Sequence, residues 1–177
     1  ALIVIDVQND FCPGGALAVP EGDIIVPGIN ALMDQADAVV LTQDWHPAGH
    51  SSFASSHEGA VPYEVIDMPY GPQVLWPDHC IENSFGSQLA DDLKSLSFDK
   101  VITKGENKSC DSYSGFYDNA KRHKTSLDTF LRKQGVKEVT IMGLATDYCV
   151  KFTALDAVEL GYKTNLIKEG VRGVELT

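Results

Sequence analysis

The sequence has few cysteines and no basic segment. Its 177 residues include four cysteines, Cys12, Cys80, Cys110 and Cys149, and no two of them are spaced as C-x-x-C. We therefore expect neither a thiolate zinc site nor a dense disulfide framework. Lys and Arg number 14 against 25 Asp and Glu, which gives a formal net charge of −11. A field of this sign repels nucleic-acid phosphates and anionic membrane surfaces, so we expect neither as a partner.

Long apolar runs are also missing. The longest, such as residues 1–5 and 38–41, fall far short of the ~20 residues that cross a bilayer. No basic segment with a cleavage site precedes the first apolar run, so we expect a cytoplasmic protein. The chain begins directly in an expected strand and ends soon after the last one, and we therefore expect further residues beyond both ends.

What the sequence does contain is an alternation of short apolar segments and amphipathic ones, without internal repeats. The first segment is rich in Ile and Val and is typical of a strand buried on both faces of a parallel sheet. The expected strands are residues 1–7, 38–42, 100–103, 138–142 and 163–167, and the expected helices are residues 29–35, 88–96, 126–134 and 146–160. This order predicts an α/β fold in a single domain over residues 1–177, with a mainly parallel sheet and helices on both faces.

Three expected strands are each followed by a side chain that could carry chemistry. Ligands bind at the carboxyl ends of the strands in such sheets. Asp6 ends the first strand, where burial would raise its pKa towards the range useful for a general base, and Lys104 ends the third. Cys149 is expected in the first turn of the last helix, with Thr146 or Asp147 as the N-cap. A helix amino end stabilises a thiolate and offers backbone N–H groups to an oxyanion.

Each of these three residues also has a more ordinary interpretation. An acid can cap a turn, most lysines are solvated, and most cysteines are structural. Together, however, an acid, a lysine and a thiol at one sheet edge indicate a nucleophile, its base and an electrostatic partner, with no need for a catalytic histidine. Cys12, Cys80 and Cys110 lie in expected loops, and no comparable argument applies to them.

A long segment, residues 43–84, interrupts the alternation of strands and helices. It contains five of the eight prolines, both tryptophans and four of the five histidines. A connection of this length inside a compact domain is more often a functional loop system than a spacer. We expect it to be a metal-binding loop system.

The candidate metal ligands begin at the end of the second expected strand. Asp44 and His46 are two residues apart, so in extended backbone both side chains lie on one face. His50 and His79 follow, and His57 is the weakest candidate. One carboxylate with two or three imidazoles suits Zn²⁺, Fe²⁺ or Mn²⁺. The alternative is that these histidines simply pack against the tryptophans.

Five groups of residues occur in the order in which one enzyme family has them, and they extend through nearly the whole chain. They are Asp6-Val-Gln-Asn-Asp-Phe-Cys-Pro-Gly-Gly-Ala-Leu, Thr42-Gln-Asp-Trp-His-Pro-Ala-Gly-His, Trp76-Pro-Asp-His-Cys, Lys104-Gly with Asp111-Ser-Tyr-Ser-Gly-Phe, and Gly143-Leu-Ala-Thr-Asp-Tyr-Cys-Val. In these residues the sequence resembles the nicotinamidases, also called pyrazinamidases, of the isochorismatase-like cysteine hydrolase superfamily.

The resemblance implies an activity and a set of catalytic residues. The expected reaction is the hydrolysis of nicotinamide, and of pyrazinamide, to the acid and ammonia. Cys149 would be the nucleophile that forms a thioester, Asp6 the proton-transfer residue and Lys104 the third catalytic group. The implied fold is a Rossmann-like α/β fold with three layers. Relatives usually continue into another helix beyond the end of this chain, which leaves both a monomer and a homo-oligomer open.

The resemblance also implies a metal site and a substrate pocket. Asp44, His46 and His79 would hold one divalent ion, with zinc as the first candidate and iron or manganese as alternatives, and His50 is a ligand in only some relatives. Further implied features are a cis peptide between Leu144 and Ala145, an oxyanion hole from the N–H groups of Ala145 and Cys149, and a pyridine pocket lined by Phe11, Trp76 and Tyr113.

Two rival functions remain from the sequence. The chain could be an isochorismatase-like hydrolase that acts on another small amide or on a vinyl ether. The metal ligands distinguish the two activities, because a metal ion gives a reason to prefer a substrate with a ring nitrogen. It could also be a metal- or dinucleotide-binding module without catalysis. No G-x-G-x-x-G follows the first strand, which weakens the dinucleotide version.

Overall fold

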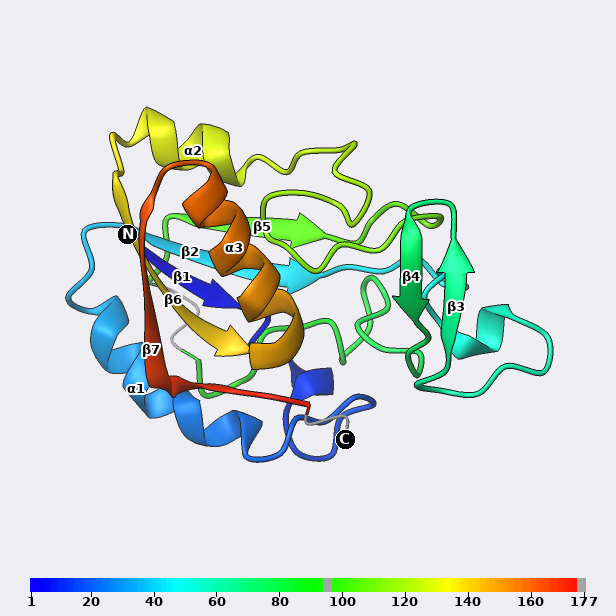
Figure 1. The fold of residues 1–177 in the computed structure, drawn as a ribbon. Coiled ribbons are helices and arrows are strands. Elements are labelled where there is room, and N and C mark those ends of the chain that lie inside the picture. The colour runs from blue at the N-terminus through cyan, green and yellow to red at the C-terminus, as the bar shows by residue number, and fades with distance from the viewer. Residues whose placement is uncertain (94–96, 175–177) are drawn as a thin grey trace.

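Five parallel strands form the centre of the protein. The structure, a computed structural model, describes residues 1–93 and 97–174. The strands are β1 (Leu2–Ile5), β2 (Val39–Asp44), β5 (Lys100–Lys104), β6 (Glu138–Leu144) and β7 (Lys163–Arg172), in the order β5-β2-β1-β6-β7 (Figure 1). A separate antiparallel hairpin consists of β3 (Val65–Met68) and β4 (Gly71–Val74), and the α-helices are α1 (Val26–Met33), α2 (Leu127–Lys133) and α3 (Lys151–Glu159).

The sheet separates two apolar cores. Leu2 and Val4 of β1 pack on the side of α1, whereas Ile3 and Ile5 pack on the side of α2 and α3 (Figure 1). All four side chains are buried, because successive residues of a strand point to opposite faces and both faces carry helices. The predicted fold class, a mainly parallel sheet with helices on both faces, is therefore confirmed. No helix within the described ranges is long and apolar enough to cross a bilayer.

One expected helix, over residues 88–96, is wrong. In the described part of this segment the backbone pairs with the chain that follows β1, and the N–H of Ala90 donates to the carbonyl of Val7 at 2.9 Å. Pairing with a distant segment satisfies the same backbone groups that a helix would use, and tertiary context overrides local propensity. Residues 94–96 lie outside the described residues.

Two other differences concern strands. The long segment 43–84 is expected to be a loop system because of its many prolines, but it contains the β3–β4 hairpin. The last strand runs to Arg172, because after an irregularity in the β6–β7 ladder the chain pairs again with Gly143 and Leu144. Both differences depend on pairings between segments, which local patterns do not encode.

The strand order positions the side chains that matter for function. Asp44 ends β2 and lies opposite Lys104, the last residue of β5. Asp6 directly follows β1, the neighbour of β2, and Leu144 ends β6 on the other side of β1. All four strands point towards the side of the molecule that carries the β3–β4 hairpin (Figure 1). One edge of the sheet thus collects these residues, as expected for a parallel α/β fold.

Candidate active site and metal-ligand cluster

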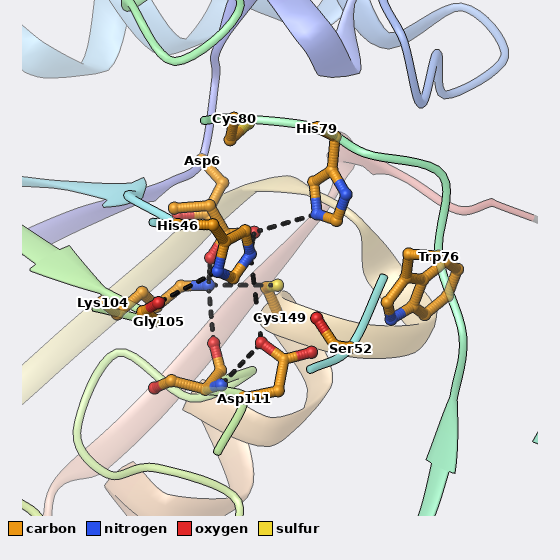
Figure 2. A network of polar contacts seen from close by, with 12 residues as sticks. Asp6, His46, Ser52, Trp76, His79, Cys80, Lys104, Gly105, Asp111 and Cys149 are labelled. Carbon is orange, nitrogen blue, oxygen red and sulfur yellow. Dashed lines mark hydrogen bonds and ion pairs between the residues drawn. The ribbon is translucent and has the colours of Figure 1, made fainter. Parts of the chain in front are cut away.

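The side chain of Lys104 is the centre of the site. Its buried Nζ lies 2.9 Å from Oδ2 of Asp6 and forms an ion pair with Oδ1 of Asp44. It also donates to the carbonyl of Ser112 at 2.9 Å and lies 3.3 Å from Sγ of Cys149 (Figure 2). Burial opposes the charge on this ammonium, but the carboxylates of Asp44 and Asp6 prevail and raise the pKa of Lys104 well above its usual value. This shift favours the charged form of Lys104 in the interior.

Asp6 contacts this cation and also lies close to the thiol. The hydroxyl of Thr42 donates to Oδ1 of Asp6 at 2.5 Å and accepts the N–H of Asp6 at 3.1 Å. The backbone of Asp6 has a left-handed φ of 46°, a conformation that Asp tolerates better than most residues. Burial raises the pKa of the Asp6 carboxyl, although Lys104 opposes the shift. A carboxyl group with a raised pKa is suited to accept and return a proton.

Cys149 completes this group of three side chains. Its sulfur and oxygens of Asp6 and Asp44 all lie within 4.8 Å of one another. Burial raises the pKa of the Cys149 thiol well above its usual value, Lys104 lowers it, and the carboxylate of Asp6 raises it further. The thiol therefore stays protonated until a base removes its proton, and Asp6, whose carboxyl group lies within hydrogen-bonding reach of the sulfur, could do so.

The helix that carries Cys149 begins differently from the expectation. A π-helical turn over Thr146–Val150 precedes α3, and its N-cap position is Ala145, with no capping side chain. Asp147, one of the two expected caps, instead accepts the N–H of Val174 at 3.0 Å through Oδ1. The expected cap is thus wrong, because this carboxylate binds the segment after β7. The peptide bond between Leu144 and Ala145 is cis, and it is the bond for which the family resemblance implies this geometry.

Three side chains next to Lys104 could hold a metal ion. Oδ2 of Asp44 lies 3.7 Å from Nε2 of His46 and 3.8 Å from Nε2 of His79 (Figure 2). The Nδ1 atoms of the two histidines lie 3.0 Å from the carbonyl of Gly105 and 2.7 Å from that of Pro77. A carbonyl can only accept, so Nδ1 is the donor in both rings, and when the ring is neutral its Nε2 presents a lone pair to the cluster.

Asp44 carries the negative charge of this cluster. Burial opposes the charged form of His46, but Asp44 raises the pKa of this ring, which has to be neutral to bind a metal ion. Burial acts against the charge on Asp44, yet Lys104 and His46 lower the pKa of this carboxyl well below its usual value. Nε2 of His46 is buried and has no hydrogen-bond partner among the described residues. An unpaired buried nitrogen is costly unless something binds it. One anionic oxygen and two imidazole nitrogens fit a divalent ion such as zinc.

The other two histidines of this region have hydrogen-bond partners of their own, although His50 also forms a group of possible ligands with His46 and Asp111. His50 is buried, with Nδ1 2.8 Å from Oγ of Ser52 and Nε2 2.8 Å from the carbonyl of Asn107. Its ring lies 4.5 Å from that of His46, but it would have to give up one of these bonds to bind a metal. Nε2 of His57 lies 2.8 Å from the carbonyl of Ser51, and this histidine does not belong to the cluster.

An aromatic pocket lies against Cys149. The residues that line it include all three aromatic side chains named from the sequence, together with Tyr148 and two residues of the metal-ligand cluster. They are Phe11, Leu17, Asp44, Trp76, His79, Asp111, Tyr113, Ala145, Tyr148, Cys149 and Val174. The ring of Trp76 is almost perpendicular to those of Tyr113 and Tyr148, with centroids 6.4 and 4.6 Å away. Such walls suit a flat, largely apolar ligand that also carries a few polar atoms.

Sequence reasoning missed several polar residues of the site. Gln8 donates to the carbonyl of Asp44 at 2.9 Å and accepts its N–H at 2.8 Å, and Thr42 binds Asp6. Thr42 could have been found, because it lies two residues from Asp44 in β2 and so shares its face. Gln8 could not, because the chain turns at Asp6, where φ is 46°. Asp111, whose Oδ1 lies 3.9 Å from Nε2 of His46, comes from an irregular loop that carries no such signal.

The fold and the site together define a class of protein. It is an α/β protein with a buried cysteine, acid and lysine at the carboxyl edge of a parallel sheet, next to a cluster of possible metal ligands and an aromatic pocket. The Isochorismatase domain family matches residues 1–176. The chain belongs to this family.

Known relatives are similar over almost the whole chain. A nicotinamidase from Escherichia coli is 54% identical, and the match covers 99% of this chain and 84% of the relative. A solved nicotinamidase/pyrazinamidase from Acinetobacter baumanii has a TM-score of 0.97 and 45% identity, covering 99% of this chain and 85% of that one. The Pyrococcus horikoshii pyrazinamidase in complex with zinc has a TM-score of 0.79 and 38% identity, covering 99% and 87%.

The electrostatics of the site give a prediction for the variant Asp6→Asn. Removing the carboxylate leaves Lys104 as the dominant charge beside Cys149, so the pKa of the thiol falls. We expect alkylation of Cys149 near neutral pH to become severalfold faster, because the thiolate is the reactive form. Peptide mass mapping after timed treatment with iodoacetamide measures the rate at each cysteine. The exposed Asp37→Asn is the control and leaves the rate unchanged. Slower alkylation in Asp6→Asn would contradict this electrostatic picture.

Proposed function

We propose that this chain hydrolyses nicotinamide to nicotinic acid and ammonia, and that it accepts pyrazinamide as well. The observation that carries the proposal is the position of the Cys149 sulfur: it lines an aromatic pocket, lies 3.3 Å from Lys104 and is within 4.8 Å of an Asp6 oxygen. The names of the E. coli and A. baumanii relatives support the same substrates.

The first half of the reaction forms a thioester. Asp6 takes the proton from the Cys149 thiol, and the sulfur attacks the carboxamide carbon, which converts the carbonyl oxygen into an oxyanion. When the carbonyl re-forms, the carbon–nitrogen bond breaks and Asp6 returns the proton to the departing nitrogen, so that ammonia leaves. Lys104 remains charged throughout and stabilises the negative charge on the carboxylate and the sulfur.

The second half releases the acid. A water molecule loses a proton to Asp6 and attacks the thioester carbon. The carbon–sulfur bond then breaks, and the thiolate recovers its proton from Asp6, which returns the site to its starting state. In both halves we assign the oxyanion to the backbone N–H groups of Ala145 and Cys149, at the start of the helical turn that carries the thiol.

Phe11, Trp76 and Tyr113 would hold the pyridine ring between them. All three line the pocket, and edge-to-face packing of Trp76 and Tyr113 gives it flat walls. Fixing the ring also fixes the carboxamide next to Cys149, and such orientation contributes a large part of the acceleration in reactions of bound substrates.

Asp44, His46 and His79 would hold one divalent ion, with zinc as the first candidate because the similar P. horikoshii pyrazinamidase is in complex with zinc. Iron and manganese accept the same ligands. When bound, the ion supplies a Lewis-acidic partner for a ring nitrogen of the substrate. Asp44 would then serve both the ion and Lys104, each through a different carboxylate oxygen.

The observations at this site support the two rival functions less well than they support the hydrolysis of nicotinamide. A binding module without catalysis does not account for a thiol, an acid and a buried lysine in contact at the pocket. A hydrolase for other amides or for vinyl ethers would not need an imidazole such as that of His46, whose buried Nε2 has no hydrogen-bond partner among the described residues.

The expected partner is one small molecule per site. The net charge of −11 disfavours nucleic acid and anionic membranes, as argued from the sequence. All four cysteines are free, which is typical of proteins in a reducing compartment and supports the inferred cytoplasmic location.

Cysteine variants test the proposed function. With nicotinamide as substrate, Cys149→Ala should lower ammonia release by at least ~10³-fold, because removing a nucleophile abolishes the chemical step. Cys12→Ala is the matched control, since Cys12 is a half-buried thiol that does not line the pocket, and its activity should stay close to that of the wild type. Ammonia release measures both. No hydrolysis by the wild type would exclude the proposed substrate, and full activity of Cys149→Ala would exclude the proposed nucleophile.

Metal content tests the proposed ligands separately from activity. We expect purified His46→Ala to lose the divalent ion, because two remaining ligands bind it too weakly, whereas Cys149→Ala retains it. His57→Ala is the matched control, because this histidine lies outside the cluster. Elemental analysis by mass spectrometry gives the ratio of metal to protein. Equal metal content in wild type and His46→Ala would contradict the ligand set.

A further inference from the structure

Gln73 is a buried polar residue in a part of the protein that otherwise has little core. It belongs to β4, whose other residues are exposed or half-buried, while Gln73 itself is fully buried. The β3–β4 hairpin lies apart from the central sheet (Figure 1). A buried amide needs partners for its donors and its acceptor, so the bonds of Gln73 show what the hairpin is connected to.

Those bonds lead to the aromatic pocket. Nε2 of Gln73 donates to the hydroxyl of Tyr113 at 2.8 Å and to the carbonyl of Val74 at 2.8 Å, and it lies 3.2 Å from Oδ2 of Asp111. Because the carbonyl of Val74 can only accept, the amide nitrogen must face this side. The hydroxyl of Tyr113 also accepts the indole N–H of Trp76 at 3.2 Å. Trp76 and Tyr113, two walls of the pocket, are therefore joined through the hydroxyl oxygen of Tyr113, which also accepts a hydrogen bond from Gln73.

The other side of the amide holds the backbone of the same tyrosine. Oε1 of Gln73 accepts from Nδ2 of Asn119 at 3.3 Å and from the hydroxyl of Tyr70 at 3.2 Å. Oδ1 of Asn119 accepts the N–H of Tyr113 at 3.0 Å. Tyr113 is thus fixed at its hydroxyl and at its backbone by a closed set of hydrogen bonds that passes through Gln73.

We infer that Gln73 is a positioning residue for substrate binding: it fixes Tyr113 against Trp76 and so sets the affinity of the pocket for a planar pyridine amide. This inference rests on the proposed function. Gln73 does not line the pocket itself, and it acts through the two aromatic side chains that do. Its loss should therefore affect binding more than the chemical step at Cys149.

The test uses Gln73→Met, which keeps the size of the side chain and removes its amide. We expect KM for nicotinamide to rise about tenfold with kcat within about twofold, because the variant loses binding that is equal in ground state and transition state. In a Tyr113→Phe background, adding Gln73→Met should change KM by less than about twofold, since the shared hydrogen bond is already absent. Gln35→Met, at an exposed position just after α1, is the control and leaves KM unchanged.

A purely structural role would give a different result. It would lower kcat through a smaller active fraction and leave KM unchanged, and this outcome would overturn the inference. Additive effects of Gln73→Met and Tyr113→Phe on KM would overturn it as well.

A second measurement needs no substrate and therefore stands even if nicotinamide is not hydrolysed. The chain has two tryptophans, Trp45 and Trp76, so ¹⁵N-tryptophan labelling gives two indole N–H signals. Gln73→Met should shift the signal of Trp76 and leave that of Trp45 in place, with Trp45→Phe providing the assignment. An unmoved Trp76 signal would overturn the positioning role, whereas a wild type without activity but with the expected shift would overturn only the proposed substrate.

Discussion

The ammonium group of Lys104 is the constraint on which the rest of the site depends. It lies in the interior between two carboxylates, and it touches the only thiol that lines the described aromatic pocket. Burying a charge is costly unless it is paired and hydrogen-bonded. Here one cation offsets the charges of Asp6 and Asp44. The thiol with its base and the metal-ligand cluster are therefore coupled electrostatically. The thiol and its proposed base share Lys104 with the proposed metal ligand.

The parallel sheet makes this arrangement possible. Since β5, β2 and β1 are neighbours and run in the same direction, their ends bring Lys104, Asp44 and Asp6 together without any long-range loop. The loops then add the groups that recognise a ligand. His79 comes from the segment after β4, and Tyr113 from the segment after β5, where Gln73 of the hairpin holds it. Chemistry thus depends on strand ends, and recognition depends on loops fixed by hydrogen bonds.

The same division explains what the sequence could predict. Asp6, Lys104 and Cys149 follow strands or begin a helix, so the α/β pattern alone brought them to one edge. Residues two positions away in extended chain, such as Thr42, were within reach of the same reasoning. Gln73 and the pairing of Ala90 with Val7 were not, because each depends on contacts between distant segments. The residue pattern also indicated Asp44, His46, His50 and His79 as candidate metal ligands, and the family resemblance selected among them and added the pocket residues; these roles remain predictions.

The charge state of Lys104 is the most direct test of this account. NMR of the ¹⁵Nζ nuclei of labelled protein reports the titration of each lysine, and Lys104→Met identifies the signal. The neighbouring carboxylates raise the pKa of this ammonium, so its charged form should persist at pH values at which the exposed lysines have already lost their protons. A Lys104 signal that titrates together with the exposed lysines, or below them, would contradict the claim that a buried cation holds the site together.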